Sequence, residues 1–166
     1  MDHKPTKRTA IVTGGGSGIG LAIAARFVKA GILTIIIGRD PQKLTAAGEQ
    51  LGEKCHAVTH DLSDLPSIPA LVERITGRYG QIDILVNNAG THLKKEFQDV
   101  TDQEFDDVLV INLRSVFALS REVVKGMLPR RSGNIINISS MAARYGLPEV
   151  IAYTASKAGI EGMTRA

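Results

Sequence analysis

The sequence contains one cysteine, Cys55, and no tryptophan, and aromatic residues make up only 4% of its 166 residues. A single cysteine excludes an intrachain disulfide and any zinc site built from several cysteines. This usage is compatible with a reducing compartment, and because we identify no targeting segment we expect a cytoplasmic protein. So few aromatic residues leave no basic surface on which bases could stack, and we therefore expect no nucleic-acid partner.

The sequence also lacks a long apolar run and an excess of charge of either sign. The longest uncharged run, residues 9–25, contains five glycines and falls short of the ~20 apolar residues that a membrane span needs. Lys and Arg total 20 against 17 Asp and Glu, and apolar residues make up 43%, which is typical of a folded globular chain rather than a disordered one. The length is that of one domain, so we interpret residues 1–166 as a single domain.

What the sequence does contain is an alternation of short apolar runs with longer amphipathic stretches. The runs are rich in β-branched residues and are continuously apolar, as in strands covered on both faces; they are residues 10–12, 32–37, 57–59, 82–86 and 134–138. Helices are expected at 18–30, from 41 with Asp40 as its cap, from a cap at Ser63 or Asp64 to 79, at 101–127, and from 151 onward. This order predicts a doubly wound parallel α/β sheet of the Rossmann type, with helices on both faces and ligands at the carboxyl ends of the strands.

A glycine-rich loop, residues 13–20, joins the first expected strand to the first expected helix. Glycines there allow a tight turn and a close approach of the backbone to a pyrophosphate, and the helix N-terminus offers free N–H groups. Leu21 follows Gly20 where a P-loop needs lysine, and Ile19 stands where a nucleophile elbow needs glycine. The loop therefore predicts a dinucleotide site, with a flexible surface loop as the alternative.

Tyr153 and Lys157 lie four residues apart in the last expected helix, so their side chains share one face. An ammonium group beside a phenol favours the phenolate, and the phenol then becomes a usable general acid–base near neutral pH. Ser139 and Ser140 directly follow the fifth expected strand. A hydroxyl at that place can donate a hydrogen bond to a carbonyl oxygen and stabilise the charge that develops on it.

Taken together, these motifs resemble the short-chain dehydrogenase/reductase family. The motifs lie in the family's order across nearly the whole chain; they are Thr13-Gly14-x-x-x-Gly18-x-Gly20, Asp61-Leu62, Asn87-Asn88-Ala89-Gly90, Asn112-Leu113-Arg114, Asn137-Ile138-Ser139-Ser140 and Tyr153-x-x-x-Lys157. The resemblance implies an NAD(P)-dependent oxidoreductase that transfers a hydride between nicotinamide and a carbonyl or secondary alcohol. The alternative is a non-catalytic nucleotide-binding module that holds only the adenosine half of the cofactor.

The resemblance assigns roles to individual residues. Tyr153 would be the acid–base, Ser140 the catalytic serine, and Lys157 would hold the nicotinamide ribose and lower the tyrosine pKa. Asn112 would hold a water that relays protons to Lys157. The implied cofactor contacts, besides Tyr153 and Lys157, are Gly14, Ser17, Gly18, Ile19, Gly20, Asp61, Leu62, Asn88, Ala89 and Gly90. Thr13 and Asn87 are expected to brace the strand ends.

Arg39 follows the second expected strand at the position that distinguishes the two nicotinamide cofactors. A carboxylate there binds the hydroxyls of the adenine ribose, whereas an arginine accommodates a 2′-phosphate. We therefore favour NADP over NAD. Asp40 is the next residue and could turn toward the ribose instead, and Ser17 stands where many NADP-preferring members carry a basic residue, so NAD remains the alternative.

The remaining histidines and the cysteine do not predict a metal site. On an extended strand, His56 and His60 would lie about 13 Å apart at ~3.3 Å per residue, which is too far for one ion. We expect Cys55 to be a packing residue. His92 lies in the loop after Gly90 and is a candidate substrate contact.

Relative to the family pattern, the sequence stops within the helix that carries Tyr153 and Lys157, before the family's last strands and substrate lid. We favour a portion of a longer protein over a natural short form, and expect the fifth strand to be a sheet edge. Because the lid selects the substrate, a sugar or polyol, a 3-oxoacyl thioester and a steroid-like ketone all stay open. The resemblance also implies a homodimer or homotetramer, paired through the helix at 101–127.

Overall fold

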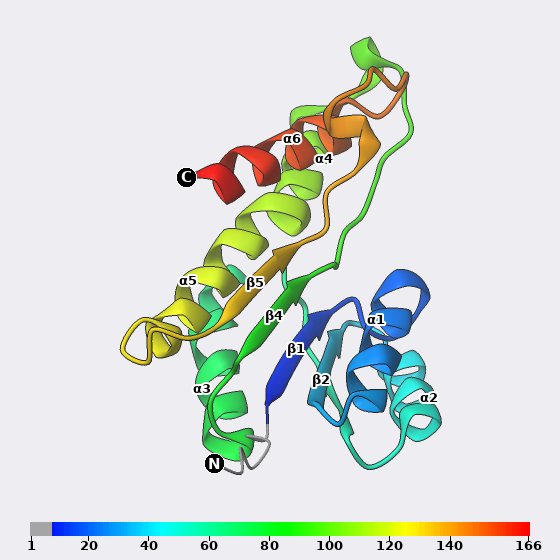
Figure 1. Ribbon diagram of the computed structural model, residues 1–166. Coiled ribbons are helices and arrows are strands. Elements are labelled where there is room, and N and C mark those ends of the chain that lie inside the picture. Colours follow the sequence, from blue (N-terminus) through cyan, green and yellow to red (C-terminus); the bar gives the residue numbers. More distant parts are fainter. Residues whose placement is uncertain (1–7) are drawn as a thin grey trace.

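The structure is a computed structural model that describes residues 8–166, and its centre is a parallel sheet of five strands (Figure 1). The strands are β1 (Thr9–Thr13), β2 (Leu33–Gly38), β3 (Cys55–Thr59), β4 (Ile84–Asn87) and β5 (Asn134–Asn137). The helices are α1 (Gly18–Lys29), α2 (Pro41–Leu51), α3 (Ile68–Tyr79), α4 (Asp102–Leu109), α5 (Ser115–Met127) and α6 (Ile151–Arg165). The strand order β3-β2-β1-β4-β5 confirms the predicted doubly wound α/β fold.

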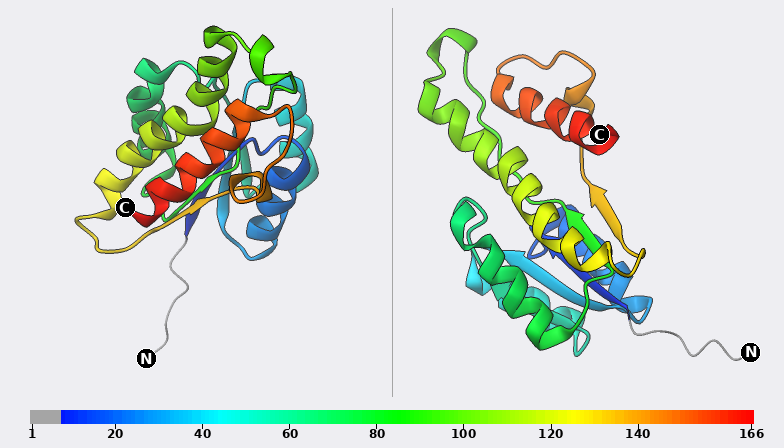
Figure 2. Two further views of the ribbon diagram at one scale, coloured as in Figure 1. Left: turned by 90° about the horizontal axis from the view of Figure 1, so that it is seen from above. Right: turned by 90° about the vertical axis from the view of Figure 1, so that its left-hand side faces the viewer.

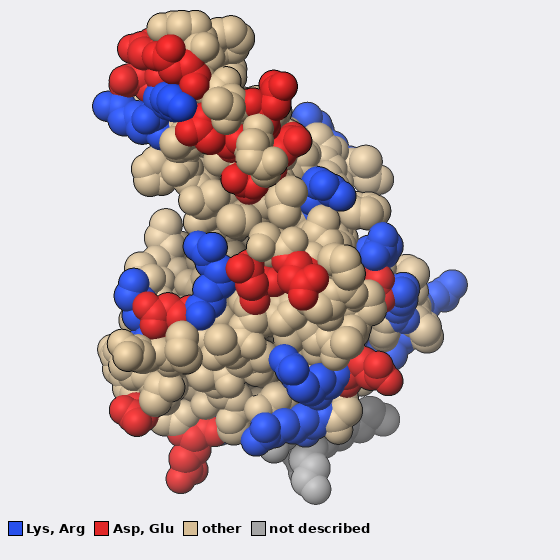
Figure 3. Space-filling view, turned by 180° about the vertical axis from the view of Figure 1, so that it is seen from behind, with Lys and Arg blue, Asp and Glu red and all other residues tan. Residues whose placement is uncertain are grey.

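Helices cover both faces of the sheet, which explains why its central strands are apolar without alternation (Figure 2). Ile11 and Leu85 face one way and pack in a cluster with α3 and α5, whereas Val12 and Val86 face the other way and pack with α1 and α2. Cys55 is buried in the second cluster, as expected for a packing residue. Over the rear face of the molecule, acidic and basic side chains are interspersed (Figure 3).

The helix predicted at 101–127 is interrupted by a π-helical turn, Val110–Arg114, between α4 and α5. Its start agrees with the sequence, because Thr101 and Glu104 form a capping box. The π turn carries Asn112, whose side chain is fully buried. Turns of this kind occur often at functional sites, and here the turn sets the direction in which Asn112 points.

The predicted cap of α3 at Ser63 or Asp64 is wrong. A short 3₁₀ turn, Leu65–Ser67, precedes the helix, which begins at Ile68. The segment before it is organised by Asp61, whose carboxylate accepts hydrogen bonds from the Ser63 amide (2.9 Å) and hydroxyl (2.8 Å). These bonds form a turn that places Asp61 and Leu62 at the carboxyl end of β3.

The strand β5 pairs only with β4 in the described part of the chain and is the edge of this sheet. Ile136 on this strand is 44% exposed, in contrast to the buried residues of β4. The expected edge is therefore confirmed, and an apolar edge of this kind favours pairing with another strand.

Candidate functional site

The glycine-rich loop lies between the carboxyl end of β1 and the start of α1. Gly14 adopts a positive φ of 67°, and its amide donates to the Ile37 carbonyl of β2 (2.7 Å). A Cβ atom at Gly20 would lie 2.2 Å from the Gly14 carbonyl oxygen, so no larger residue fits where the helix packs on the loop. Ser17 occupies the N-cap position without a side-chain cap bond, and the first amides of α1 are left free to bind an anion.

Thr13 and Asn87 brace the strand ends as expected. The Thr13 hydroxyl accepts from the amides of Asn88 (2.9 Å) and Ala89 (3.0 Å) and donates to the Val86 carbonyl (3.2 Å). The Asn87 amide donates to Asn137 Oδ1 (2.8 Å) and Ser120 Oγ (3.0 Å). The side chain of Asn88 also binds the loop, because its Nδ2 donates to the Thr13 carbonyl (3.0 Å). These bonds fix the loop relative to the residues that follow β4.

A cavity of about 170 Å³ opens beside this loop. It brings together residues from the ends of β1, β2, β3 and β4, namely Gly14, Gly38, Arg39, His60, Asp61, Leu62, Ala89, Gly90 and Ile111. Three of these lining residues, Gly38, His60 and Ile111, were not predicted from the sequence. Gly38 ends β2 and His60 directly follows β3, so the rule that ligands bind at carboxyl ends would have found both.

Asp40 does not turn toward this cavity. Its Oδ1 accepts hydrogen bonds from the amides of Gln42 (3.0 Å) and Lys43 (3.1 Å), and these cap α2. The hydrogen bond from the Lys43 amide is the largest cause that lowers the pKa of Asp40. The carboxylate therefore has partners on its own helix, whereas Arg39 lines the cavity.

Lys157 lies deep between α6 and the end of β5. Its Nζ donates to the Ile138 carbonyl (2.7 Å) and lies 5.7 Å from the centre of the Tyr153 ring. The side chain is only 4% exposed, and burial lowers the pKa of Lys157 because the charged form loses water contacts. The ammonium and the phenol that the sequence pairs by spacing are thus neighbours in the fold.

This burial predicts that Lys157 destabilises the protein at neutral pH. We expect Lys157→Met to raise the free energy of unfolding by ~1 kcal/mol, which corresponds to roughly 2–4 °C in Tm. The folded state holds the lysine proton less tightly than the unfolded state, so the penalty is present at neutral pH and decreases as pH rises toward 10.5. Thermal melts between pH 7 and 10 test this, with Lys29→Met at an exposed position as the control. An unchanged or lowered Tm at pH 7 would contradict it.

Asn112 connects the loop after β4 to α6. Its Oδ1 accepts from the Thr91 amide (2.8 Å), and its Nδ2 donates to the Thr91 carbonyl (2.8 Å) and to Ser156 Oγ (3.0 Å). Ser156 is itself buried and donates to the Tyr153 carbonyl (2.7 Å). The amide of Asn112 therefore holds the segment after Gly90 against the helix that carries Tyr153 and Lys157.

The two serines after β5 have different partners. Ser140 Oγ accepts from the Ala142 amide (3.2 Å) at the start of a short 3₁₀ turn and keeps its own proton for donation. Ser139 Oγ donates to Glu161 of α6 (3.0 Å). The ring of His92 meets the Tyr153 ring edge-on, with 6.4 Å between centroids. His92 thus lies beside the tyrosine, as a substrate contact would.

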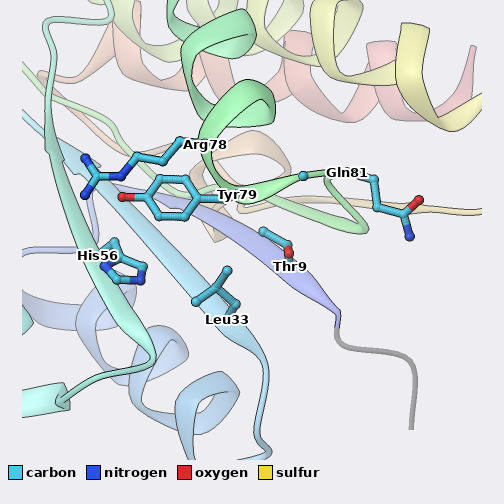
Figure 4. Close-up of a pocket in the computed structure, with 7 residues that line it drawn as sticks. Thr9, Leu33, His56, Arg78, Tyr79 and Gln81 are labelled. Carbon is cyan, nitrogen blue, oxygen red and sulfur yellow. The ribbon is translucent and has the colours of Figure 1, made fainter. Parts of the chain in front are cut away.

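A separate pocket lies at the opposite end of the sheet, and His56, Arg78 and Tyr79 are among the residues that line it (Figure 4). His56 stacks on Tyr79 with 4.8 Å between ring centroids, and the Arg78 guanidinium lies 5.2 Å from the Tyr79 centroid. His60 instead contacts Ser67 Oγ (3.1 Å) near the cavity at the carboxyl ends. Within residues 8–166, no three metal-ligating side chains gather into a group that could hold an ion.

A sequence model described as short chain dehydrogenase matches residues 8–166, which is all of the described structure. The chain belongs to the short-chain dehydrogenase family. None of the helices in the described range is both long and apolar enough to cross a membrane.

Curated relatives and solved structures resemble this chain in sequence and in fold. The granaticin polyketide synthase putative ketoacyl reductase 1 of Streptomyces violaceoruber is 39% identical over an alignment 165 residues long, which covers 96% of this chain and 61% of the relative. A crystal structure of an actinorhodin polyketide ketoreductase with NADPH has a TM-score of 0.92 at 37% identity and covers 96% of this chain and 63% of that one. A metagenomic short-chain oxidoreductase in complex with NADP has a TM-score of 0.91 at 33% identity, with 95% and 73% covered.

The chain spans 58% to 65% of the length of curated short-chain dehydrogenase relatives that it matches. The matched part contains every strand end described above. The start of α1 can hold an anion. The chain itself supplies a cation, Arg39, beside the cavity at the end of β2, and the phenol of Tyr153 near the buried ammonium group of Lys157. Proton transfer at the phenol, next to a bound nucleotide, is the chemistry that these groups allow.

Proposed function

We propose that this chain is the cofactor-binding and catalytic part of an NADP-dependent oxidoreductase that interconverts a carbonyl compound and a secondary alcohol. The observation that carries the proposal is the buried Lys157 beside Tyr153. Lys157 Nζ donates to the Ile138 carbonyl, and Asn112 donates to Ser156, which in turn donates to the Tyr153 carbonyl. Membership of the family and the NADPH or NADP in two solved relatives support it. A nucleotide-binding module without catalysis would need neither the phenol nor the buried ammonium group.

The residues present fit the cofactor. A Cβ atom at position 14 or 20 would collide with the backbone or with Asn88, so glycine at both positions allows the tight loop that leaves the first amides of α1 accessible to a phosphate. Arg39 lines the cavity at the end of β2, while Asp40 is bound to its own helix. We propose that the cofactor is held by Gly14, Ser17, Gly18, Ile19, Gly20, Arg39, Asp61, Leu62, Asn88, Ala89, Gly90, Tyr153 and Lys157. When bound, NADP supplies the hydride chemistry.

The chain's own residues then handle the proton. Tyr153 gives or takes it at its phenolic oxygen, near the Lys157 ammonium group. Lys157 uses one N–H on Ile138, so its other N–H groups stay available for the ribose hydroxyls and the phenol. Ser140 donates a hydrogen bond from its hydroxyl to the substrate oxygen and stabilises developing charge there, while the transferred proton is that of Tyr153. Asn112 positions the segment after β4 and, in this proposal, the water that relays protons to Lys157.

For the substrate, we propose a ketone with an apolar body. Relatives are named as ketoacyl reductases, as a 3beta-hydroxysteroid dehydrogenase and as a 2-dehydro-3-deoxy-D-gluconate 5-dehydrogenase, so their names span apolar and sugar-acid substrates. The loop between β5 and α6, the helix that carries Tyr153, exposes Met141, Tyr145 and Leu147, which favour apolar groups. A 3-oxoacyl thioester, a steroid ketone and a sugar ketone offered with NADPH test this by loss of NADPH absorbance. Faster turnover of the sugar ketone would contradict the proposal.

We also propose that the protein works in the cytoplasm and self-associates through α4, α5 and α6. A cavity of about 820 Å³ on that side is lined by Val110, Leu113, Phe117 and Met163 among others, and Phe117 is 52% exposed. Burial of such apolar surface favours association. Light scattering should therefore give the mass of a dimer or tetramer, and Phe117→Glu should lower it. A strictly monomeric protein at high concentration would contradict this prediction.

A further inference from the structure

Two cations line a cavity between the glycine-rich loop and the start of α2. Arg39 comes from the β2–α2 connection and Lys43 from the first turn of α2, and Ser17 belongs to the opposite wall. Gly14, Gly38 and Arg39 line both this cavity and the one that contains Asp61 and Leu62. The two cavities are therefore neighbours, and a nucleoside in one can place a substituent of its ribose in the other.

The floor of this cavity is apolar and its walls are small. Leu44 is only 2% exposed and lies beneath it. A Cβ atom at Gly16 or at Gly38 would come within 3.4 Å of Leu44 Cδ2, so glycine at both positions keeps the space open. Polar contacts to a guest must therefore come from the rim, where Arg39 and Lys43 lie.

Asp40 is the acidic residue on that rim, and its charge is already engaged. One oxygen caps α2, and the other lies 3.6 Å from Lys43 Nζ. Both side chains of this ion pair are largely exposed, at 48% and 68%, and pairs of that kind are weak. The Lys43 ammonium is thus kept near the rim, yet it can move to a stronger anion at little cost.

We propose that Lys43 is a second cationic ligand, besides Arg39, for the 2′-phosphate of NADP and that it contributes to the choice of NADP over NAD. This inference rests on the proposed function, because it requires that the nucleotide bind as described. A phosphate monoester carries roughly 1.5 to 2 negative charges at pH 7, so the single charge of Arg39 neutralises only part of it. Arginine supplies a planar two-pronged contact and lysine a compact point charge, and the two are complementary around one phosphate.

The test uses two nucleotides that differ only in the 2′-phosphate, adenosine 2′,5′-bisphosphate and adenosine 5′-monophosphate. Calorimetric titration of the protein with each should show tighter binding of the bisphosphate. Lys43→Gln should weaken the bisphosphate about five- to tenfold, as expected for one exposed charge-assisted contact, and leave the monophosphate within about twofold. Lys29→Gln removes the same charge at the far end of α1 and should change neither affinity. Since Lys43 is a surface residue, the variant should remain folded, which circular dichroism checks.

The possible outcomes separate this inference from the function on which it rests. If the protein selects the bisphosphate but Lys43→Gln binds it like the unchanged protein, or loses both nucleotides equally, Lys43 is not a phosphate ligand and the NADP proposal stands. If the unchanged protein does not distinguish the two nucleotides, both the NADP proposal and the role of Lys43 are overturned. A selective loss in Lys43→Gln alone supports both.

Discussion

Replacement of Tyr153 by phenylalanine is expected to abolish turnover and to leave cofactor binding nearly intact. The phenol is the proton donor and acceptor of the proposed reaction, and general acid–base groups contribute roughly 10²–10⁴-fold to rate. Phenylalanine keeps the ring that packs edge-on against His92 and lies near Lys157. The measurement is the kcat for a ketone substrate together with the dissociation constant for NADPH.

The control for this variant is Tyr79→Phe. Tyr79 lies in the pocket at the opposite end of the sheet and stacks on His56, so the same loss of a hydroxyl there should leave kcat almost unchanged. Turnover of Tyr153→Phe above a few per cent of the unchanged protein would sink the assignment of the acid–base. Loss of NADPH binding in the same variant would point to a structural role for the tyrosine instead.

Replacement of Arg39 by alanine is expected to weaken NADPH far more than NADH. The two cofactors differ in the 2′-phosphate, and a hydrogen bond to a charged group contributes ~1.5–3 kcal/mol. This range corresponds to roughly a ten- to 150-fold loss of NADPH affinity. Because NADH has no 2′-phosphate, its affinity should change little. Dissociation constants for both cofactors, measured by fluorescence or calorimetry, give the answer.

Arg26→Ala is the matched control, because Arg26 is an exposed arginine in the last turn of α1. It should alter neither affinity at moderate salt concentration. Equal weakening of NADPH and NADH by Arg39→Ala, or no effect on either, would contradict the assignment. Such a result would indicate that Asp40 leaves its capping position and binds the ribose hydroxyls.

The sequence predicts most of the fold because the apolar pattern and the local caps agree. Strands buried on both faces appear as continuous apolar runs, and their order follows from the short, right-handed connections of such sheets. The capping box at Thr101 is a turn that threonine and glutamate encode locally. These features need no knowledge of distant contacts.

The parts that could not be predicted depend on contacts between distant residues. The π turn at Val110–Arg114 lies in an apolar stretch that continues the helical pattern, and Asn112 bonds to Thr91 and Ser156, which are 21 and 44 residues away. The start of α3 was misplaced because Asp61 uses the Ser63 groups in a turn.

The site was predicted unevenly for a similar reason. Sequence spacing alone pairs Tyr153 with Lys157, but only the fold shows that Lys157 is buried and bound to the Ile138 carbonyl. For Asp40, the neighbouring Pro41 predicts a helix start, yet the choice between cap and ribose contact required the observed bonds to Gln42 and Lys43. Lys43 was not singled out, because an exposed lysine in a first helical turn carries no signal by itself.

The most direct test of the proposed reaction follows the hydride itself. The protein is incubated with NADPH that carries deuterium at the transferred position of nicotinamide C4, and with a 3-oxoacyl thioester, and the alcohol product is analysed by mass spectrometry. Direct transfer predicts one deuterium on the new carbinol carbon. The Tyr153→Phe variant should form no alcohol product. An alcohol product without deuterium, or no product from the unchanged protein with any ketone while it still binds NADPH, would contradict the account.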